Sequence, residues 1–296
     1  MGSIDFHLAD PRVRSMTRRR EIQLHLKSLK DINGIMGSMK NLSLVEIRKL
    51  ERFLSAQKRV VESTKSMAAD FLFFHTDYLS VPERRFHIYI VIGSERGFCG
   101  DFNESLIDTL MIEMKNNPTV QSLIVPVGRK ICNKLEGNKD VAEFLPGPGV
   151  AEEVHALLIQ LLKALEKLNS LYGPSFLTVL HHIDATPKAQ ITPVLPPFSD
   201  LNLNTMQSMS PPILNVPPGD FFSELVDHFL FAALHEIFYA SLMAEHQRRV
   251  QHLGGAIKRL DDRLIELTIK RNELRQEEIT EEIEVIMLST SAIEKL

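Results

Sequence analysis

The sequence predicts an α/β protein in which long N- and C-terminal helices form an antiparallel coiled coil, together with a small Rossmann-like α/β domain. Three observations predict this fold class. Proline-free stretches with helical apolar periodicity occupy both ends of the chain, the middle alternates between strand and helix patterns, and the two end helices need each other to bury their apolar positions. We expect residues 1–80 and 218–296 to be the shaft helices and residues 81–217 to be an α/β foot domain.

The N-terminal stretch contains no proline between residues 12 and 78, and its apolar residues recur at intervals of mostly three and four. This spacing predicts one long helix. The periodic residues are Ile22, Leu26, Leu29, Ile32, Met36, Met39, Leu50, Phe53, Val60, Met67 and Phe71. Gly34 and Gly37 interrupt the pattern, and a glycine inside a helix costs about 1 kcal/mol relative to alanine. The pair therefore predicts a weak or specially packed point in the helix.

The C-terminal stretch is free of proline after Pro218 and shows a cleaner repeat. Apolar residues step by three and four through Val250, Leu253, Ile257, Leu260, Leu264, Leu267, Arg271 and Leu274, which predicts an a/d seam interrupted by one arginine. After Leu274 the apolar phase shifts to Ile279, Ile283 and Ile286. At about 1.5 Å per residue each end helix would reach roughly 100 Å, so we expect a partner to cover much of the shaft.

Between the end helices the pattern alternates. Strands are expected at residues 85–92, 123–127 and 176–183, and helices at residues 104–115, 129–135 and 152–171. Strands separated by helices predict a mostly parallel sheet with helices on its faces. Residues 184–218 are rich in Pro, Asn and Ser, which indicates an exposed connection that includes a short last strand at residues 191–195.

The charge balance excludes a general nucleic-acid binder, because 34 Lys and Arg residues face 38 Asp and Glu residues, for a formal charge of −4. The distribution is more informative. Residues 11–67 hold 14 basic and 5 acidic side chains, whereas residues 276–296 hold one basic and six acidic side chains. A chain that is polarised in this way suits docking onto charged partner surfaces.

Cys99 and Cys132 lie in different segments without a CxxC spacing, which predicts neither a disulfide framework nor a metal cluster and favours a reducing, cytoplasmic compartment. The N-terminus lacks the apolar core of a signal peptide, and no run of about 18 apolar residues occurs. We therefore expect no membrane span in the chain itself.

A glycine-rich turn follows the first predicted strand and is a candidate for chemistry. Gly93, Gly97 and Gly100 form GxxxGxxG, which matches neither GxGxxG nor the triphosphate loop that ends in Gly-Lys-Ser or Gly-Lys-Thr. Cys99 precedes a predicted helix, where a thiol can become nucleophilic, but the sequence indicates no adjacent base. A structural turn with a small residue is the favoured interpretation.

Two further patterns resemble functional motifs. His235, Glu236 and His246 share one helix, yet Tyr239 stands where HExxH requires its second histidine, so polar positions on a packed helix are favoured over zinc. The arginines at 18–20 could bind nucleic acid or acidic lipid, but without interleaved aromatics a solvated or partner-facing basic surface is favoured. We expect no catalytic residue, cofactor or metal, and hence a protein that is not an enzyme by itself.

Three segments resemble the gamma subunit of F-type ATP synthases, and they occur in that family's order. They are HLKSLKDINGIMGSMKNL at 25–42, GSERGFCGDFN at 93–103 and RNELRQEEITEEIEVI at 271–286. The resemblance spans almost the whole chain and agrees with the helix, α/β domain, helix order. It implies a central rotor shaft that couples ion flow through the membrane sector to conformational cycling of the catalytic beta subunits.

The resemblance also implies partners and contact residues. The partners would be the ring of alpha and beta subunits, the epsilon subunit and the c ring, with the complex peripheral to the cytoplasmic side of the inner membrane. Met39, Arg275, Gln276, Thr280 and Glu282 match family positions that contact the ring. Gly93, Gly97, Cys99 and Gly100 match the family's structural turn.

Two other functions remain open from the sequence. The chain departs from the family pattern at Gly34, at Gly37 and at its C-terminus, which suits the gamma subunit of a divergent second F-type ATPase that mainly hydrolyses ATP to pump ions. The coupling ion, proton or sodium, is likewise open. A non-rotating coiled-coil scaffold is the remaining alternative, and the polar set from Arg275 to Glu282 speaks against it because a scaffold does not need it.

Overall fold

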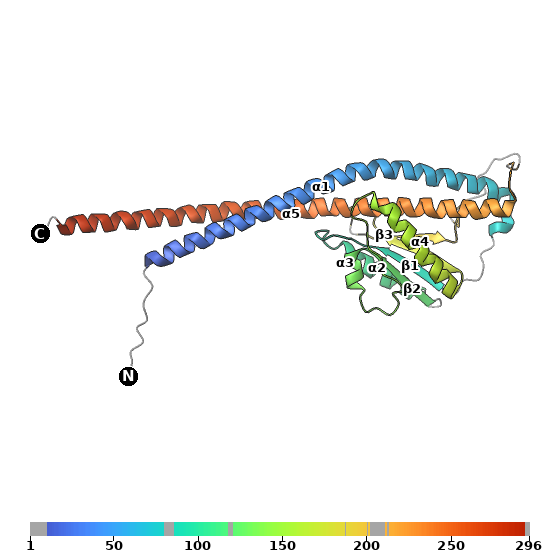
Figure 1. Cartoon of the computed structure of the whole chain (residues 1–296), viewed down its shortest axis with the longest axis horizontal. Helices are drawn as coiled ribbons and strands as arrows, with labels where there is room; N and C mark the ends of the chain where they lie inside the picture. The colour runs from blue at the N-terminus through green and yellow to red at the C-terminus, as the bar shows by residue number, and fades with distance from the viewer. Residues whose placement is uncertain are drawn as a thin grey trace, which may run out of the picture. The chain divides into compact units, whose positions relative to one another are not determined.

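The computed structural model describes residues 11–79, 86–117, 121–186, 188–199, 201, 211 and 213–293. The chain divides into two compact units. Met1–Asn41 with Leu253–Leu296 form what we call the coiled-coil unit, and Leu42–His252 form the α/β unit. Helices α1 (Pro11–Phe74) and α5 (Pro218–Ile293) each contribute residues to both units (Figure 1).

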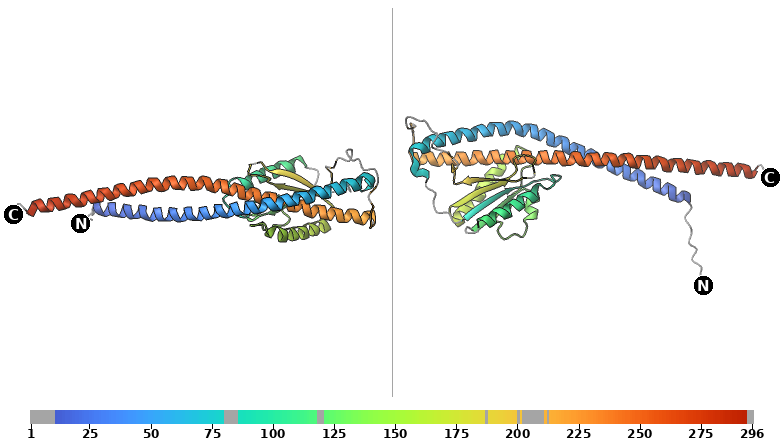
Figure 2. Two further views of the ribbon diagram at one scale, coloured as in Figure 1. Left: turned by 90° about the horizontal axis from the view of Figure 1, so that it is seen from above. Right: turned by 180° about the vertical axis from the view of Figure 1, so that it is seen from behind.

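In the coiled-coil unit the two helices run antiparallel and side by side (Figure 2). The seam of α5 follows the predicted repeat, since Leu253, Leu267 and Leu274 are buried and the seam residues between them are half-buried. On α1 the buried residues Leu26 and Met36 face this seam with the same three and four spacing. The predicted coiled coil of N- and C-terminal helices is thereby confirmed.

The seam differs from the prediction at two places where polar residues take apolar positions. Ile32 is 43% exposed, and the neighbouring Asn33 occupies the seam, where its Nδ2 donates to Asp261 Oδ1 at 2.6 Å. Beyond Leu274 the seam continues through Glu278, which pairs with Arg19 at 3.2 Å, and leaves Ile279 exposed. The predicted shift of phase is wrong because helix geometry, not polarity, sets which residue meets the partner helix.

Helix α1 continues without interruption through Gly34 and Gly37. A Cβ atom added at either glycine would meet nothing within 4 Å. Close packing therefore does not require these glycines, and their effect on helix stability stays a prediction.

The α/β unit contains a four-stranded sheet in the order β2 (Gln121–Val127), β1 (Phe86–Ile92), β3 (Ser175–His181) and β4 (Gln190–Leu195). Strand β1 pairs in parallel with β2 and β3, and β4 pairs antiparallel with β3. The predicted small, mostly parallel sheet is confirmed, and each predicted strand overlaps an observed one.

Helices cover both faces of this sheet, as alternating strands and helices require (Figure 1). They are α2 (Phe102–Asn116), α3 (Arg129–Lys134) and α4 (Glu153–Tyr172), and a short 3-10 helix lies at Thr76–Leu79. One face of β1, with Ile90, packs with α4 and with Phe238 of α5. The other face, with Val91, packs with Phe102 of α2 and Ile131 of α3.

Helix α5 thus supplies a central element of the α/β core. A third apolar cluster joins Phe71 near the end of α1 to Phe229 of α5. By length and composition alone, one stretch of α5 is apolar enough to cross a membrane. However, 61% of this stretch is buried inside the fold, as expected for a core helix.

Candidate functional site

The glycine turn lies between β1 and α2, and its backbone contacts buried residues of α3 and α2. A Cβ atom on Gly93 would lie 2.5 Å from the Ile131 Cβ, so only glycine allows the turn to approach α3 this closely. Gly100 has a φ of 64°, which favours glycine. Asn103 accepts the Ser94 backbone N–H at 2.9 Å and donates to the Ser94 hydroxyl at 2.9 Å. These contacts hold the turn close to α3 and to the first turn of α2.

Helix α5 holds the same turn through a buried arginine. The Arg249 Nε donates to the Gly97 carbonyl at 3.1 Å, and its Nη2 lies 3.4 Å from the Cys99 sulfur. The same guanidinium forms an ion pair with Glu245, one helical turn earlier, and both side chains are buried. Glu245 and Arg249 therefore link α5 to the glycine turn within the α/β core.

The electrostatics of the turn oppose nucleophilic chemistry. Burial, with a smaller contribution from Glu245, raises the pKa of the Cys99 thiol to about 12. A thiol with this pKa is protonated near neutral pH, and only the thiolate is a strong nucleophile. Burial also raises the pKa of Glu245 and, together with Arg249, lowers the pKa of His246 to about 3.

The turn also offers no open phosphate cradle. The Gly93 N–H donates to the Val127 carbonyl at 2.9 Å. The Glu95 carboxylate accepts the backbone N–H groups of Arg129 and Gly147, each at 2.9 Å, and so occupies the place that an anion would need. Among the described residues no group of three or more His, Cys, Asp or Glu side chains could hold a metal ion.

The predicted ring-contact residues of α5 lie on the coiled-coil unit. Arg275, Gln276, Thr280 and Glu282 are all exposed. The Thr280 hydroxyl donates to the Gln276 carbonyl at 2.9 Å, so the hydroxyl oxygen remains available only as an acceptor. The Gln276 amide keeps its donors and its acceptor. Met39 on α1 is half-buried.

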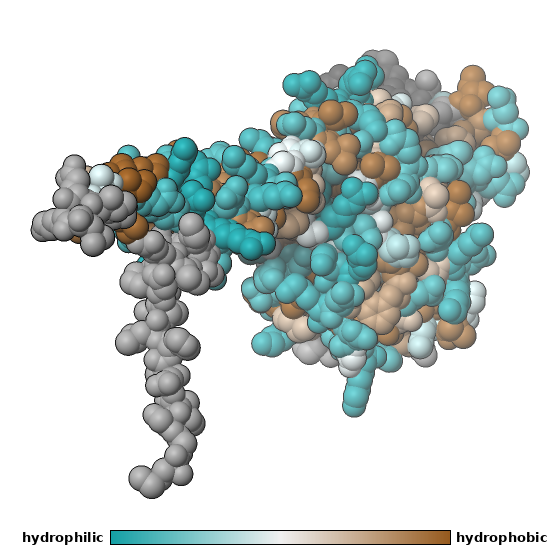
Figure 3. Space-filling model, turned by 60° about the vertical axis from the view of Figure 1, so that its left-hand side comes forward, coloured by the Kyte–Doolittle hydropathy of each residue, from teal (hydrophilic) through white to brown (hydrophobic). Residues whose placement is uncertain are grey.

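Apolar residues near the C-terminal end of α5 add a second exposed surface. Hydrophobic atoms gather there in Figure 3, and Ile283 and Met287 are 51% and 67% exposed. Ile283 was expected in the seam, and Met287 was not predicted to have a role. The signal was a run of apolar residues that no longer fits the three and four spacing of the preceding seam.

The fold resembles solved structures of ATP synthase rotors. The chain superposes on a chain of the Euglena gracilis mitochondrial ATP synthase OSCP/F1/c-ring structure with a TM-score of 0.62 and 14% identity, covering 94% of this chain and 95% of that one. A second structure, of the Euglena gracilis ATP synthase rotor, gives a TM-score of 0.56 at 13% identity, covering 89% of this chain and 99% of that one. This chain therefore shares its fold with those two chains.

Sequence comparison gives the family. The ATP synthase family model matches residues 18–293, and the chain belongs to this family. Its relatives include the ATP synthase gamma chain of Clostridium botulinum (strain Langeland), 26% identical over 273 residues, with 90% of this chain and 95% of the relative covered. The gamma chain of Pelotomaculum thermopropionicum is also 26% identical, over 295 residues, with 94% of this chain and all of the relative covered.

Proposed function

We propose that this chain is the central rotor shaft of an F-type ATP synthase and couples ion flow through the membrane sector to the conformational cycle of the catalytic beta subunits. The observation that carries this proposal is the family match from residue 18 to residue 293, which includes both helices of the coiled coil. The chain itself is a non-catalytic subunit, and the buried, protonated Cys99 and the carboxylate-capped turn agree with that role.

The mechanism is mechanical. A shaft with one asymmetric surface can favour a different conformer in each of three otherwise equal neighbours, because a contact shifts a conformational equilibrium by its difference in affinity for the two states. The exposed side chains of Arg275, Gln276, Thr280 and Glu282 are suited to such contacts. We place them, with Met39, at the surface that meets the alpha and beta ring.

The remaining assignments complete the proposal. The epsilon subunit and the c ring are the partners of the foot. The complex is peripheral to the cytoplasmic side of the inner membrane. Gly93, Gly97, Cys99 and Gly100 serve as a structural turn. We assign residues 1–80 and 218–296 to the shaft and residues 81–217 to the foot.

Reconstitution tests this function. The full chain is mixed with alpha and beta subunits from the same organism, and ATP hydrolysis is measured together with rotation of a bead attached to an exposed cysteine introduced on α2. We expect one chain per ring and stepwise, ATP-driven rotation. A complex that forms but hydrolyses ATP without rotation would contradict the proposal and favour a static scaffold.

A further inference from the structure

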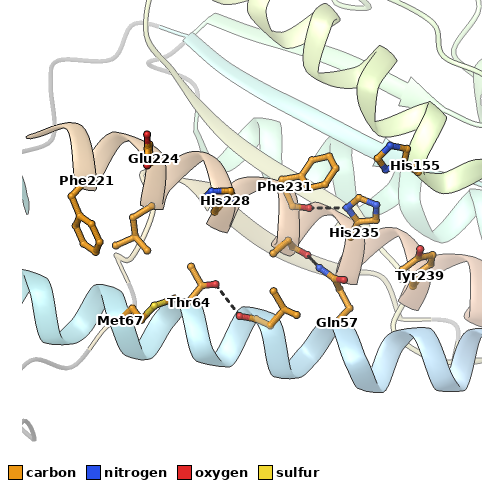
Figure 4. A pocket seen from close by; sticks show the side chains of 13 residues that line it. Gln57, Thr64, Met67, His155, Phe221, Glu224, His228, Phe231, His235 and Tyr239 are labelled. Atoms are coloured by element: carbon orange, nitrogen blue, oxygen red, sulfur yellow. Dashed lines mark hydrogen bonds between the residues drawn. The ribbon is translucent and has the colours of Figure 1, made fainter. Parts of the chain in front are cut away.

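A cavity of about 580 Å³ lies in the α/β unit between α1, α4 and α5 (Figure 4). This volume falls within the range of about 300 to 1,000 Å³ that is typical of small-molecule sites. Its lining includes the aromatic side chains of Phe221, Phe231 and Tyr239 on α5 and the imidazole of His155 on α4. The cavity therefore offers several flat, apolar faces to a ligand. We call it the aromatic cavity.

Three polar side chains that line the aromatic cavity each donate a hydrogen bond to a backbone carbonyl (Figure 4). The Gln57 Nε2 donates to the Ala232 carbonyl at 3.0 Å, and the Thr64 hydroxyl donates to the Val60 carbonyl at 2.9 Å. The His235 Nδ1 lies 3.1 Å from the Phe231 carbonyl. Because a carbonyl only accepts, this contact makes Nδ1 the protonated nitrogen of the neutral ring and Nε2 the acceptor.

What these groups leave for a ligand is mostly acceptor capacity. Gln57 Oε1, the Thr64 hydroxyl oxygen and His235 Nε2 accept no hydrogen bond from another described residue. Burial lowers the pKa of His235, which keeps its ring neutral near pH 7. Glu224 adds an exposed carboxylate to the lining. A ligand that carries a hydrogen-bond donor fits these three acceptors, while the Tyr239 hydroxyl and the second N–H of Gln57 remain as donors in the lining.

We propose that the aromatic cavity binds a planar aromatic molecule that donates a hydrogen bond. The ring packs against Phe231 and Tyr239, whose rings flank His235 along α5, and the donor group reaches the His235 Nε2. This site is separate from the coupling role proposed above and does not depend on it, since every residue used here belongs to the α/β unit and none is assigned to ring contact.

Three probes of one shape test the chemical class. The purified full chain is titrated with 2-naphthol, 2-methoxynaphthalene and 2-naphthoate near neutral pH, with binding followed by calorimetry. We expect 2-naphthol to bind, and 2-methoxynaphthalene and 2-naphthoate to bind about tenfold more weakly, because neither can donate a hydrogen bond near neutral pH. Absence of 2-naphthol binding, or equal affinities for all three probes, would overturn the proposal.

Variants locate the site. Val60 and Met67 line the cavity but are 50% and 48% exposed, so a larger side chain can be placed there without disturbing the core. Val60→Trp and, separately, Met67→Trp should weaken 2-naphthol binding at least about tenfold by filling the cavity. Val45→Trp is the matched control, because Val45 is 56% exposed on the same helix and lies outside the lining.

A third variant tests the hydrogen bond. His235→Leu should weaken 2-naphthol about tenfold and leave 2-methoxynaphthalene nearly unchanged, because only the first probe uses the imidazole acceptor. Thermal unfolding followed by circular dichroism verifies that each variant is folded. If the tryptophan variants are folded and bind 2-naphthol as the wild type does, the probe binds elsewhere and the proposal fails.

Discussion

The Arg249 Nε lies 3.1 Å from the carbonyl oxygen of Gly97, a residue 152 positions earlier in the chain. The guanidinium also compensates the buried carboxylate of Glu245. Removing the arginine would leave that carboxylate charged and unpaired inside the core, which costs far more than the lost hydrogen bonds.

We therefore expect Arg249→Met to lower the free energy of unfolding by about 3 to 5 kcal/mol near pH 7. The folded-state pKa of Glu245 is raised, so protonation stabilises the folded variant, and the loss should shrink as pH falls. Urea unfolding at several pH values measures both effects. A double variant with Glu245→Gln should recover part of the loss, and a loss that is independent of pH would contradict the buried-charge explanation.

Cys99 should be chemically inert in the folded protein. It is 4% exposed, and its pKa is raised to about 12, so little thiolate forms even at mildly alkaline pH. We expect iodoacetamide to leave Cys99 unmodified until urea unfolds the chain, as peptide mass spectrometry would show. Cys99→Ser should leave ATP turnover of the assembled complex nearly unchanged. Loss of most of the activity would instead indicate that Cys99 takes part in catalysis.

His181 should make the α/β unit acid-sensitive. Its Nε2 lies 3.0 Å from the Thr192 hydroxyl oxygen, and burial lowers its pKa to about 4, whereas the unfolded chain binds the proton near 6.5. Stability is therefore full above about pH 6.5 and falls as pH decreases, by roughly 2 kcal/mol at about pH 5 for this one histidine.

The measurement is urea unfolding at about pH 7 and about pH 5. His181→Gln should lose about 2 kcal/mol less than the wild type between these conditions. His25→Gln, at an exposed position on α1, is the matched control. An identical pH dependence in His181→Gln and the wild type would contradict the assignment.

Replacing both helical glycines of α1 with alanine should strengthen the helix. Gly34 and Gly37 have open space where a Cβ atom would stand, so Gly34→Ala with Gly37→Ala should stabilise the segment by about 1 to 2 kcal/mol in total. Hydrogen exchange across residues 28–42 reports the change. If the wild-type segment already exchanges as slowly as the flanking turns, these glycines do not weaken the helix.

The polar set on α5 should matter for coupling and not for folding. Gln276→Leu with Thr280→Val preserves size and removes the Gln276 amide and the Thr280 acceptor, while the exposed position of both residues keeps the helix intact. We expect assembly to survive and the ATP-driven rotation rate to fall about tenfold. Lys270→Gln, also exposed on α5, is the control. A wild-type rotation rate in the double variant would mean that these residues do not contribute to torque.

Periodicity accounts for most of the fold that could be predicted. The repeat around Leu253 and Leu267 gave the α5 seam, and the alternation of apolar strands with helices gave the sheet, because both patterns report burial along a regular backbone. Asn33 and Glu278 continue the three and four spacing but were missed as seam residues, because the prediction followed apolar residues and both are polar. The link from Arg249 to Gly97 was invisible because no local pattern encodes a contact across 152 positions.

Among the predicted functional residues, the polar set on α5 is exposed, as a partner contact requires. The glycine turn could be interpreted from spacing because a phosphate loop has strict rules, and the Glu95 carboxylate explains why an anion is not needed there. The aromatic cavity had no sequence signal, because its lining comes from three helices that are far apart along the chain.

The pairs Asn33 with Asp261 and Arg19 with Glu278 have a consequence for torsion. Twisting the coiled coil makes its two helices slide lengthwise past each other. Leucine contacts alone permit such a slip, because one heptad resembles the next. A slip by one heptad would separate both polar pairs at once. The two pairs therefore favour one lengthwise alignment of the two helices over alignments shifted by a heptad.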